Sequence, residues 1–271
     1  MKRMKRTLAI LAIMTTVGCT IPIQPATPPD EELASVQINN TQSTTLLLDT
    51  LKNTYQDIQP EIVFNGIENN HETNLALLQN GDTTFVVTNH LSYSDSVTFW
   101  AAPLAQDGLA IITHADNPVS NLRIEQLRRI YRGYITNWQD VGGADLDITL
   151  LSRESGSGTR AEFERLVMGQ QRTSPNAQVV ASPAATLQRL IETPGAIAYL
   201  PLSQTTTGIR ILAIDDVRPS FTTIGNNSYS LRYTIYIIGL SEPEGIYRNF
   251  IGWMQGAEGQ NVIRSHYAPL P

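Results

Sequence analysis

Over residues 36–88, the spacing of apolar residues alternates between that of strands and that of helices. Short apolar runs are typical of strands buried in a sheet, and apolar residues three or four positions apart are typical of a helix that buries one face. The pattern predicts strands at residues 36–39, 61–65 and 84–88 and helices at residues 46–55 and 73–78. Because strands and helices alternate, we expect a mainly parallel sheet covered by helices.

A second α/β unit is predicted from about residue 108 to about residue 214. Its predicted elements are helices at residues 124–132, 161–168 and 184–192 and a buried strand at residues 147–152. The segment at residues 161–168 is predicted to be helical because Phe163, Leu166 and Val167 fall on one face. Two more elements follow, an apolar strand at residues 231–240 and a helix at residues 245–254.

A loop of small residues joins the buried strand to the helix after it, with the sequence Arg153-Glu-Ser-Gly-Ser-Gly-Thr-Arg. Unpaired amides at a helix start, together with the helix dipole, favour an anion. Glycine permits close approach, the hydroxyls of Ser157 and Thr159 can donate, and Arg153 adds a planar charge. The loop is therefore a candidate anion site. The alternative is a plain connection in which Ser157 or Thr159 caps the helix and Glu162 completes a capping box.

The same loop, with the Phe-x-x-Leu helix after it, resembles the phosphate-binding proteins of bacterial phosphate ABC importers. Other segments that resemble this family in kind and order are residues 105–112, 117–119, 127–138, 194–199 and 258–260. The resemblance covers most of residues 100–271 and is weak in the N-terminal third. It implies two α/β lobes of the type II periplasmic-binding-protein kind, with a ligand cleft between them and closure about a hinge. The implied division is lobe 1 at residues 35–106, lobe 2 at residues 107–214 and a return to lobe 1 over residues 215–271.

The resemblance also implies which residues bind the anion. The second-lobe ligands would be Arg153, Ser157, Gly158 and Thr159, and the first-lobe hydroxyl loop would be Ser43, Thr44 and Thr45. For the first-lobe loop, the alternative is simple capping of the following helix by Ser43 or Thr44. Gln42 stands before that loop, where glycine is usual in the family.

The turn that precedes the second predicted helix departs from the family pattern. It contains Glu68 and Glu72, which would repel phosphate unless their side chains point away. His71 falls near a serine ligand of the family, and the alternative is an exposed histidine of the turn.

Thr84 falls, by counting along the chain, where the family has a buried aspartate that accepts the proton of hydrogen phosphate. Asp82 would take this place if the register slips by two. A threonine hydroxyl can donate or accept, so weaker discrimination between phosphate and sulfate is expected than in the family.

The first 19 residues have the layout of a bacterial secretory signal. Basic residues at the start precede an apolar run over residues 7–17 that is too short to span a bilayer. The end of the segment, Thr16-Val-Gly-Cys19, is similar to a lipobox, and Cys19 is the only cysteine of the chain. We expect lipidation at Cys19, a Pro-rich tether over residues 20–34, and a protein anchored outside the cytoplasmic membrane.

The chain is acidic, with a formal net charge of −6. Without residues 1–18 it would keep 15 basic and 25 acidic residues, a net charge of −10. An acidic surface argues against nucleic acid as a partner. The four histidines, His71, His90, His114 and His266, lack the spacing of metal ligands. Neither a metal nor a cofactor is expected.

We therefore expect a monomeric binding protein that captures phosphate or a related tetrahedral oxyanion and delivers it to an ABC permease. An enzyme with Ser157 as nucleophile would need a positioned base, and the sequence indicates none. The remaining alternative is a degenerate binding protein that keeps the fold but serves in signalling or as a scaffold. The altered turn and Thr84 favour that alternative.

Overall fold

The computed structural model describes residues 34–91 and 98–270. The expected signal segment, Cys19 and nearly all of the expected tether lie outside the described residues. Within those two ranges, no helix is both long enough and apolar enough to cross a membrane.

The first half of the fold is a parallel sheet with helices, as the alternating pattern predicts. Its elements are β1 (Ala34–Thr41), the 3-10 turn η1 (Gln42–Thr44), α1 (Thr45–Ile58), β2 (Ile62–Asn65), β3 (Glu68–Asn69), α2 (His71–Asn80) and β4 (Phe85–Thr88). β1 pairs in parallel with β2, β3 and β4. α1 buries Leu47, Leu51 and Tyr55, which are spaced about one helical turn apart. α2 ends at Gly81, whose φ of 79° is the left-handed conformation that glycine favours.

The second half holds a further parallel group of strands and most of the remaining helices. Its elements are β6 (Asn121–Leu122), α3 (Ile124–Tyr131), η2 (Trp138–Val141), β7 (Thr149–Arg153), α4 (Gly158–Phe163), the π-helical turn η3 (Glu164–Met168), β8 (Gln178–Val180), α5 (Pro183–Ile191), β9 (Ala196–Pro201), η4 (Leu202–Gln204), β10 (Ile209–Ile211), β11 (Ala213–Ile214) and α6 (Phe221–Gly225). β7 pairs in parallel with β8 and β9. The helix predicted at residues 161–168 begins three residues earlier, at Gly158, so the last three residues of the small-residue sequence form its first turn.

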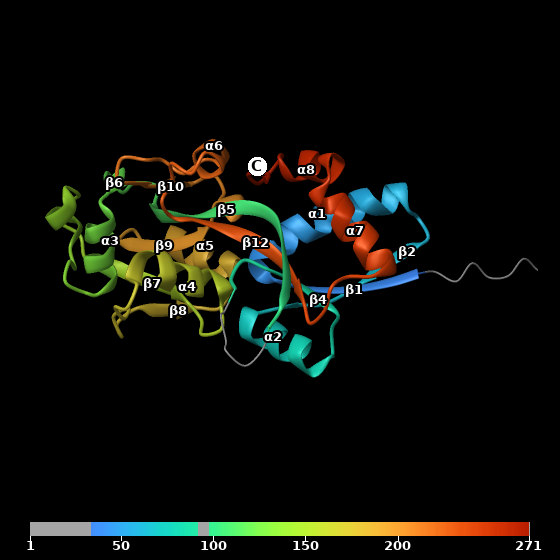
Figure 1. The fold of residues 1–271 in the computed structure, drawn as a ribbon. Coiled ribbons are helices and arrows are strands. Elements are labelled where there is room, and N and C mark those ends of the chain that lie inside the picture. The colour runs from blue at the N-terminus through green and yellow to red at the C-terminus, as the bar shows by residue number, and fades with distance from the viewer. Residues whose placement is uncertain (1–33, 92–97, 271) are drawn as a thin grey trace, which may run out of the picture. The chain divides into compact units, whose positions relative to one another are not determined.

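Two long strands connect the halves. β5 (Trp100–His114) and β12 (Arg232–Gly239) are antiparallel neighbours, and Figure 1 shows both crossing the middle of the molecule. β12 also pairs with β4, and β5 also pairs with β9, which gives the strand order β2-β1-β4-β12-β5-β9-β7-β8. β5 is unbroken at residues 106 and 107, so the expected lobe boundary there falls inside a strand.

The described chain ends in two helices that pack on the first half. They are α7 (Gly245–Gln255) and α8 (Ala257–Ile263). The Phe250 ring of α7 lies 4.8 Å from the Tyr55 ring of α1, and α8 also contacts α1 (Figure 1). The sequence pattern predicts α7 and does not predict α8.

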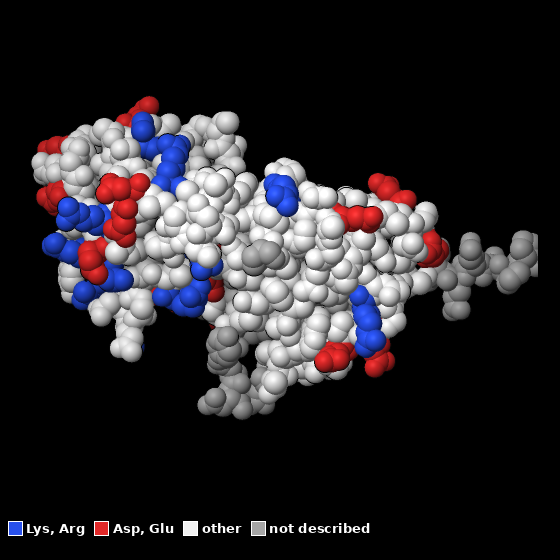
Figure 2. All heavy atoms as spheres, turned by 45° about the horizontal axis from the view of Figure 1, so that its top comes forward, with Lys and Arg blue, Asp and Glu red and all other residues white. Residues whose placement is uncertain are grey.

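Charged side chains are unevenly spread over the face shown in Figure 2. They are frequent on the half that holds α3 and sparse on the other half. Basic and acidic groups lie side by side where they are frequent, so this face has no large region of a single sign.

Candidate functional site

The carboxyl ends of β1, β4 and β7 meet between the two halves. Gln42, which follows β1, accepts a hydrogen bond of 2.7 Å from Arg153 at the end of β7. Asn89, which comes directly after β4, lies 3.5 Å from the hydroxyl of Thr159. Open α/β sheets bind ligands outside the carboxyl ends of their strands, so this is where a ligand is expected.

Arg153, the expected cation of the site, is 2% exposed. Its Nε and Nη2 donate to the carboxylate of Glu154 at 2.8 and 3.0 Å, and Nη2 also donates to Gln42 Oε1. Arg153 Nη1 is buried and has no hydrogen-bond partner among the described residues. Burying a polar group without a partner is costly, so Nη1 marks a place where an anion would be stabilised.

Two glycines shape the loop after Arg153. Gly156 has a φ of 81°, in the left-handed region. A Cβ at Gly158 would lie 2.4 Å from Asn89 Oδ1 and 3.5 Å from the Cβ of His71. Gly158 therefore lets two residues of the first half approach the loop closely.

The alternative interpretation of the loop, helix capping, is confirmed in part. Ser157 Oγ accepts from the backbone N–H of Arg160 at 3.4 Å and caps α4. Glu162 does not complete a capping box and instead binds His90. A cap satisfies only one of the N–H groups at a helix start, so capping does not exclude anion binding.

The expected first-lobe hydroxyl loop lies in η1 and at the start of α1. The Thr44 hydroxyl is buried. It donates to the carbonyl oxygens of Thr41 and Val87, each at 3.0 Å. Ser43 Oγ lies 3.1 Å from Thr41 Oγ1. Neither side chain caps α1, so the capping alternative is wrong for this loop.

Thr45 contacts one of the two glutamates of the altered turn. It accepts from Asn40 Nδ2 at 2.8 Å and donates to Glu68 Oε2 at 2.5 Å. The Glu72 carboxylate lies against Gly156, because a Cβ there would be 3.0 Å from Glu72 Oε2. The Thr45 hydroxyl and Glu68 therefore bind each other within the first half.

Thr84 lies at the other end of β4 from this site. It precedes the strand, is exposed, and its hydroxyl is 3.4 Å from the Tyr247 hydroxyl. Asp82 is also exposed and also precedes β4. Asn89 follows the strand, is 1% exposed, and its Oδ1 has no hydrogen-bond partner in the described chain. The count along the sequence selected the wrong end of β4, and the structure places Asn89 at the end that faces the loop.

His71 opens α2 and is 3% exposed, so the alternative of an exposed turn histidine is wrong. Its Nδ1 lies 2.9 Å from Thr88 Oγ1, and its ring centroid lies 5.1 Å from that of His90. Burial, and to a lesser degree the nearby His90, lowers the pKa of His71 to about 4, against the opposing effect of Glu162. The His71 ring is therefore neutral at neutral pH.

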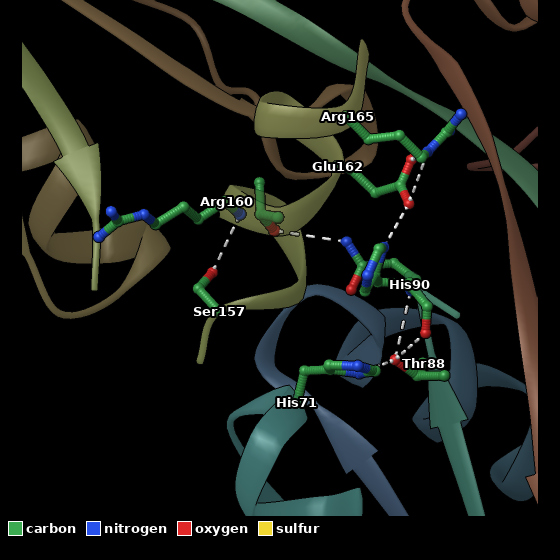
Figure 3. A network of polar contacts seen from close by, with 9 residues as sticks. His71, Thr88, His90, Ser157, Arg160, Glu162 and Arg165 are labelled. Carbon is green, nitrogen blue, oxygen red and sulfur yellow. Dashed lines mark hydrogen bonds and ion pairs between the residues drawn. The ribbon is translucent and has the colours of Figure 1, made fainter. Parts of the chain in front are cut away.

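A polar network joins this histidine pair to the second half (Figure 3). His90 Nδ1 lies 2.7 Å from Glu162 Oε1, and Arg165 Nη2 donates to Glu162 Oε2 at 2.5 Å. His71 and Thr88 belong to the first half, whereas Glu162 and Arg165 belong to the α4–η3 helix of the second half.

Backbone groups also join the halves. The N–H groups of His71 and Glu72, at the start of α2, donate to the carbonyl of Gly156 at 2.9 and 3.3 Å. Gln204 Nε2 donates to the carbonyl of Gln42 at 2.7 Å. The halves are therefore closed on each other around the loop.

Two hollows flank the contact between His90 and Glu162. Glu162 lines one of about 410 Å³, together with Asn89 and residues of β12. His90 lines the other, of about 170 Å³, together with Ser157 and the start of α2.

Asp107 is a fully buried carboxyl group in β5. It accepts from the Gly108 amide at 2.7 Å and from Ser203 Oγ at 2.6 Å. Burial raises the pKa of Asp107 to about 7, and these hydrogen bonds oppose the shift. Ser203 precedes Gln204, so Asp107 fixes the turn that contacts Gln42.

Sequence reasoning missed Asn89, Gln204 and the pair of His90 and Glu162. One signal was available for Asn89 and His90, because both directly follow the predicted strand at residues 84–88. The contact between His90 and Glu162 could not be predicted in this way, because the two residues are 72 positions apart in the sequence. Over residues 34–91 and 98–270, no three His, Cys, Asp or Glu side chains are placed so that they could hold a metal ion.

Residues 25–258 match the PBP superfamily domain. The chain belongs to the PBP superfamily. This PBP-superfamily protein is 28% identical over 166 residues to the phosphate-binding protein PstS of Bacillus subtilis, covering 60% of this chain and 55% of that protein. It is 29% identical over 171 residues to PstS of Borreliella burgdorferi, covering 59% of this chain and 61% of that protein. Each match therefore spans less than two thirds of the relative.

Solved structures of the same fold cover more of the chain. A phosphate ABC transporter substrate-binding protein from Clostridium perfringens, solved with bound phosphate, has a TM-score of 0.82 and 23% identity and covers 88% of this chain and 100% of its own. An ABC-type phosphate transport receptor from Vibrio cholerae has a TM-score of 0.74 and 26% identity, covering 87% of this chain and 100% of its own. The fold expected from the sequence is confirmed, and these four proteins are named as binding or receptor proteins.

Proposed function

We propose that this PBP-superfamily protein captures inorganic phosphate, or a related tetrahedral oxyanion, between its two halves. The observation that supports this most is the buried guanidinium of Arg153, whose Nη1 has no hydrogen-bond partner among the described residues. It lies at the carboxyl end of β7, directly before a small-residue loop that opens a helix. The similarity to phosphate-binding proteins from two bacteria supports the same ligand.

The site would hold the anion by dipoles and hydrogen bonds more than by net charge. Glu154 already balances the charge of Arg153 through two hydrogen bonds. The donors left for a ligand include Arg153 Nη1, the hydroxyls of Ser157 and Thr159, and the amides at the start of α4. Asn89 Oδ1 would accept a hydrogen bond from a protonated oxyanion.

In this proposal the protein is a monomeric, non-enzymatic lipoprotein. Lobe 1, residues 35–106 and 215–271, and lobe 2, residues 107–214, would open and close about β5 and β12. Cys19 would carry the lipid anchor outside the cytoplasmic membrane, and the loaded protein would deliver its anion to an ABC permease. The names of the relatives, which describe components of phosphate ABC transport, support this role.

Calorimetric titration of the protein lacking residues 1–18 tests the proposal. Phosphate, arsenate and sulfate are titrated in turn, and saturable binding of phosphate at one site per chain is expected. If none of the three oxyanions gives a heat of binding, and circular dichroism shows that the protein is folded, the proposed ligand is refuted.

A second candidate function is a degenerate binding protein that serves in signalling or as a scaffold. One observation favours it, because the first N–H groups of α2 donate to the Gly156 carbonyl and are not available to an anion. The same titration decides between the two functions, since a scaffold protein would bind none of the three oxyanions.

A further inference from the structure

We propose that His90 and Glu162 form a latch that sets how long a bound anion remains between the halves. The latch does not need to touch the anion. The inference rests on the proposed function, and it assigns to that site a pair of residues that controls ligand release.

The latch joins groups from opposite halves. His90 follows β4 of the first half, and Glu162 lies in α4 of the second half. Their Nδ1 and Oε1 atoms are 2.7 Å apart, and the side chains are 15% and 5% exposed. A hydrogen bond between such groups is strong when it is shielded from water.

Each partner is held in place by its own half. Arg165 binds Glu162 from the next turn of the same helix. The backbone N–H of His90 donates to Thr88 Oγ1 at 3.3 Å, and this hydroxyl also contacts His71. Because both groups are already oriented, closing the latch costs little conformational entropy.

The latch lies beside the residues that would hold the anion. His90 is next to Asn89, which contacts Thr159, and Glu162 is one helical turn from Thr159. Parting His90 from Glu162 would therefore draw Asn89 away from the start of α4. Glu162 lines one of the two hollows and His90 lines the other, so each partner of the latch borders a hollow.

The position of the latch predicts an effect on the rate of anion release and none on the rate of association. An anion would meet the loop before the latch closes, so the association rate should not depend on the latch. Release requires the latch to part. Removing one hydrogen bond to a charged group is expected to speed release about 10- to 100-fold.

The test compares Glu162→Ala and His90→Ala with Glu125→Ala, because alanine can neither donate nor accept the hydrogen bond of the latch. The last variant is a matched control. Glu125 pairs with Arg128 three positions on in a helix, as Glu162 pairs with Arg165, whereas Glu162 also binds His90 of the other half. Release of inorganic phosphate is measured by stopped flow with an excess of a fluorescent phosphate reporter. Faster release from both latch variants, with unchanged association and an unchanged control, is the expected result. Equal release rates in all proteins would overturn the latch and leave the proposed function standing.

A second measurement needs no ligand. Small-angle X-ray scattering of the ligand-free proteins should give a larger radius of gyration for the two latch variants than for the parent and the control. If the parent binds no phosphate but the latch variants expand, His90 and Glu162 hold the halves together, but the proposed function fails and the control of phosphate release fails with it. Identical radii of gyration in all four proteins would overturn the latch.

Discussion

Gln42 Oε1 accepts a hydrogen bond of 2.7 Å from Arg153 Nη2, so a side chain of the first half orients the buried guanidinium of the second. Gln42 stands where glycine is usual in the phosphate-binding family, and glycine could not make this contact. The backbone carbonyl of Gln42 also accepts from Gln204. A position that departs from the family pattern is therefore one of the points where the two halves meet.

Arg153→Ala should abolish anion binding without unfolding the protein. Truncating one partner of a buried charge pair costs about 2–5 kcal/mol, or roughly 30- to several-thousand-fold in affinity. Gln42→Ala keeps the guanidinium and loses one hydrogen bond, so its affinity should fall only about tenfold. Calorimetric titration with phosphate gives both values, and Arg189→Ala, an exposed arginine of α5, is the control. Phosphate binding by Arg153→Ala equal to that of the parent would show that the site is elsewhere.

Cys19→Ser should release the protein from the membrane or leave it unprocessed there. One acyl chain gives only marginal membrane binding, so a stable anchor would need several chains at this cysteine. The measurement is the distribution of the protein between membrane and soluble fractions, together with its mobility on a gel. Thr20→Ser is the matched control, because it alters the next residue and keeps Cys19. If membrane retention and processing are unchanged in Cys19→Ser, Cys19 does not carry a lipid anchor.

Most elements of the fold were predictable because their apolar residues repeat at the period of the element. The length of β5 was not, since Pro103 cannot donate a ladder hydrogen bond and argues against a strand. The structure places Pro103 beside a bulge, where the partners change from Ala105 with Ile235 to Pro103 with Tyr236. α8 was missed because its seven residues are short and show no apolar repeat.

The part of the site that is formed by residues close together in the sequence was predictable. Arg153 and the loop after it lie on one strand and one helix start, so their chemistry could be read from the order of residues. Contacts between distant segments could not be read in this way. Thr84 was chosen by counting, and counting does not tell which end of β4 faces the ligand, whereas the strand-end rule favours Asn89.

The contribution of His71 to stability should fall as the pH is lowered, whereas Asp107, whose pKa burial raises to about 7, contributes in the opposite direction. The pKa of His71 is about 4 in the folded protein, below the ordinary value of 6.5. The unfolded chain therefore binds a proton as the pH falls through 6.5, while the folded protein binds it only near pH 4. The resulting loss of unfolding free energy is about 2 kcal/mol between roughly pH 7.5 and pH 5.

Urea unfolding of the parent and of His71→Gln at these two pH values measures this loss as the difference between the two proteins, since both keep Asp107. The variant should lose less stability than the parent by that amount, because glutamine does not titrate. His266→Gln replaces an exposed histidine and should behave as the parent does. Equal pH dependence of the parent and His71→Gln would mean that the buried ring is not the group responsible.

Asn89→Asp should raise the preference for phosphate over sulfate. The buried Asn89 amide is neutral and can present either its oxygen or its NH₂ group to a ligand, so it should tolerate an anion with or without a proton. A carboxylate at this place would accept the proton of hydrogen phosphate and repel sulfate, which has no proton to donate. The carboxylate replaces the neutral amide oxygen as the acceptor of that proton, and a bond to a charged group is about 1–1.5 kcal/mol stronger, so phosphate binding should strengthen about 5- to 10-fold. Thr84→Asp is the matched control, because it places the same carboxylate at the exposed end of β4. Competition titrations with phosphate and sulfate measure this selectivity. If the selectivity changes in Thr84→Asp and not in Asn89→Asp, the acceptor residue is Thr84 and not Asn89.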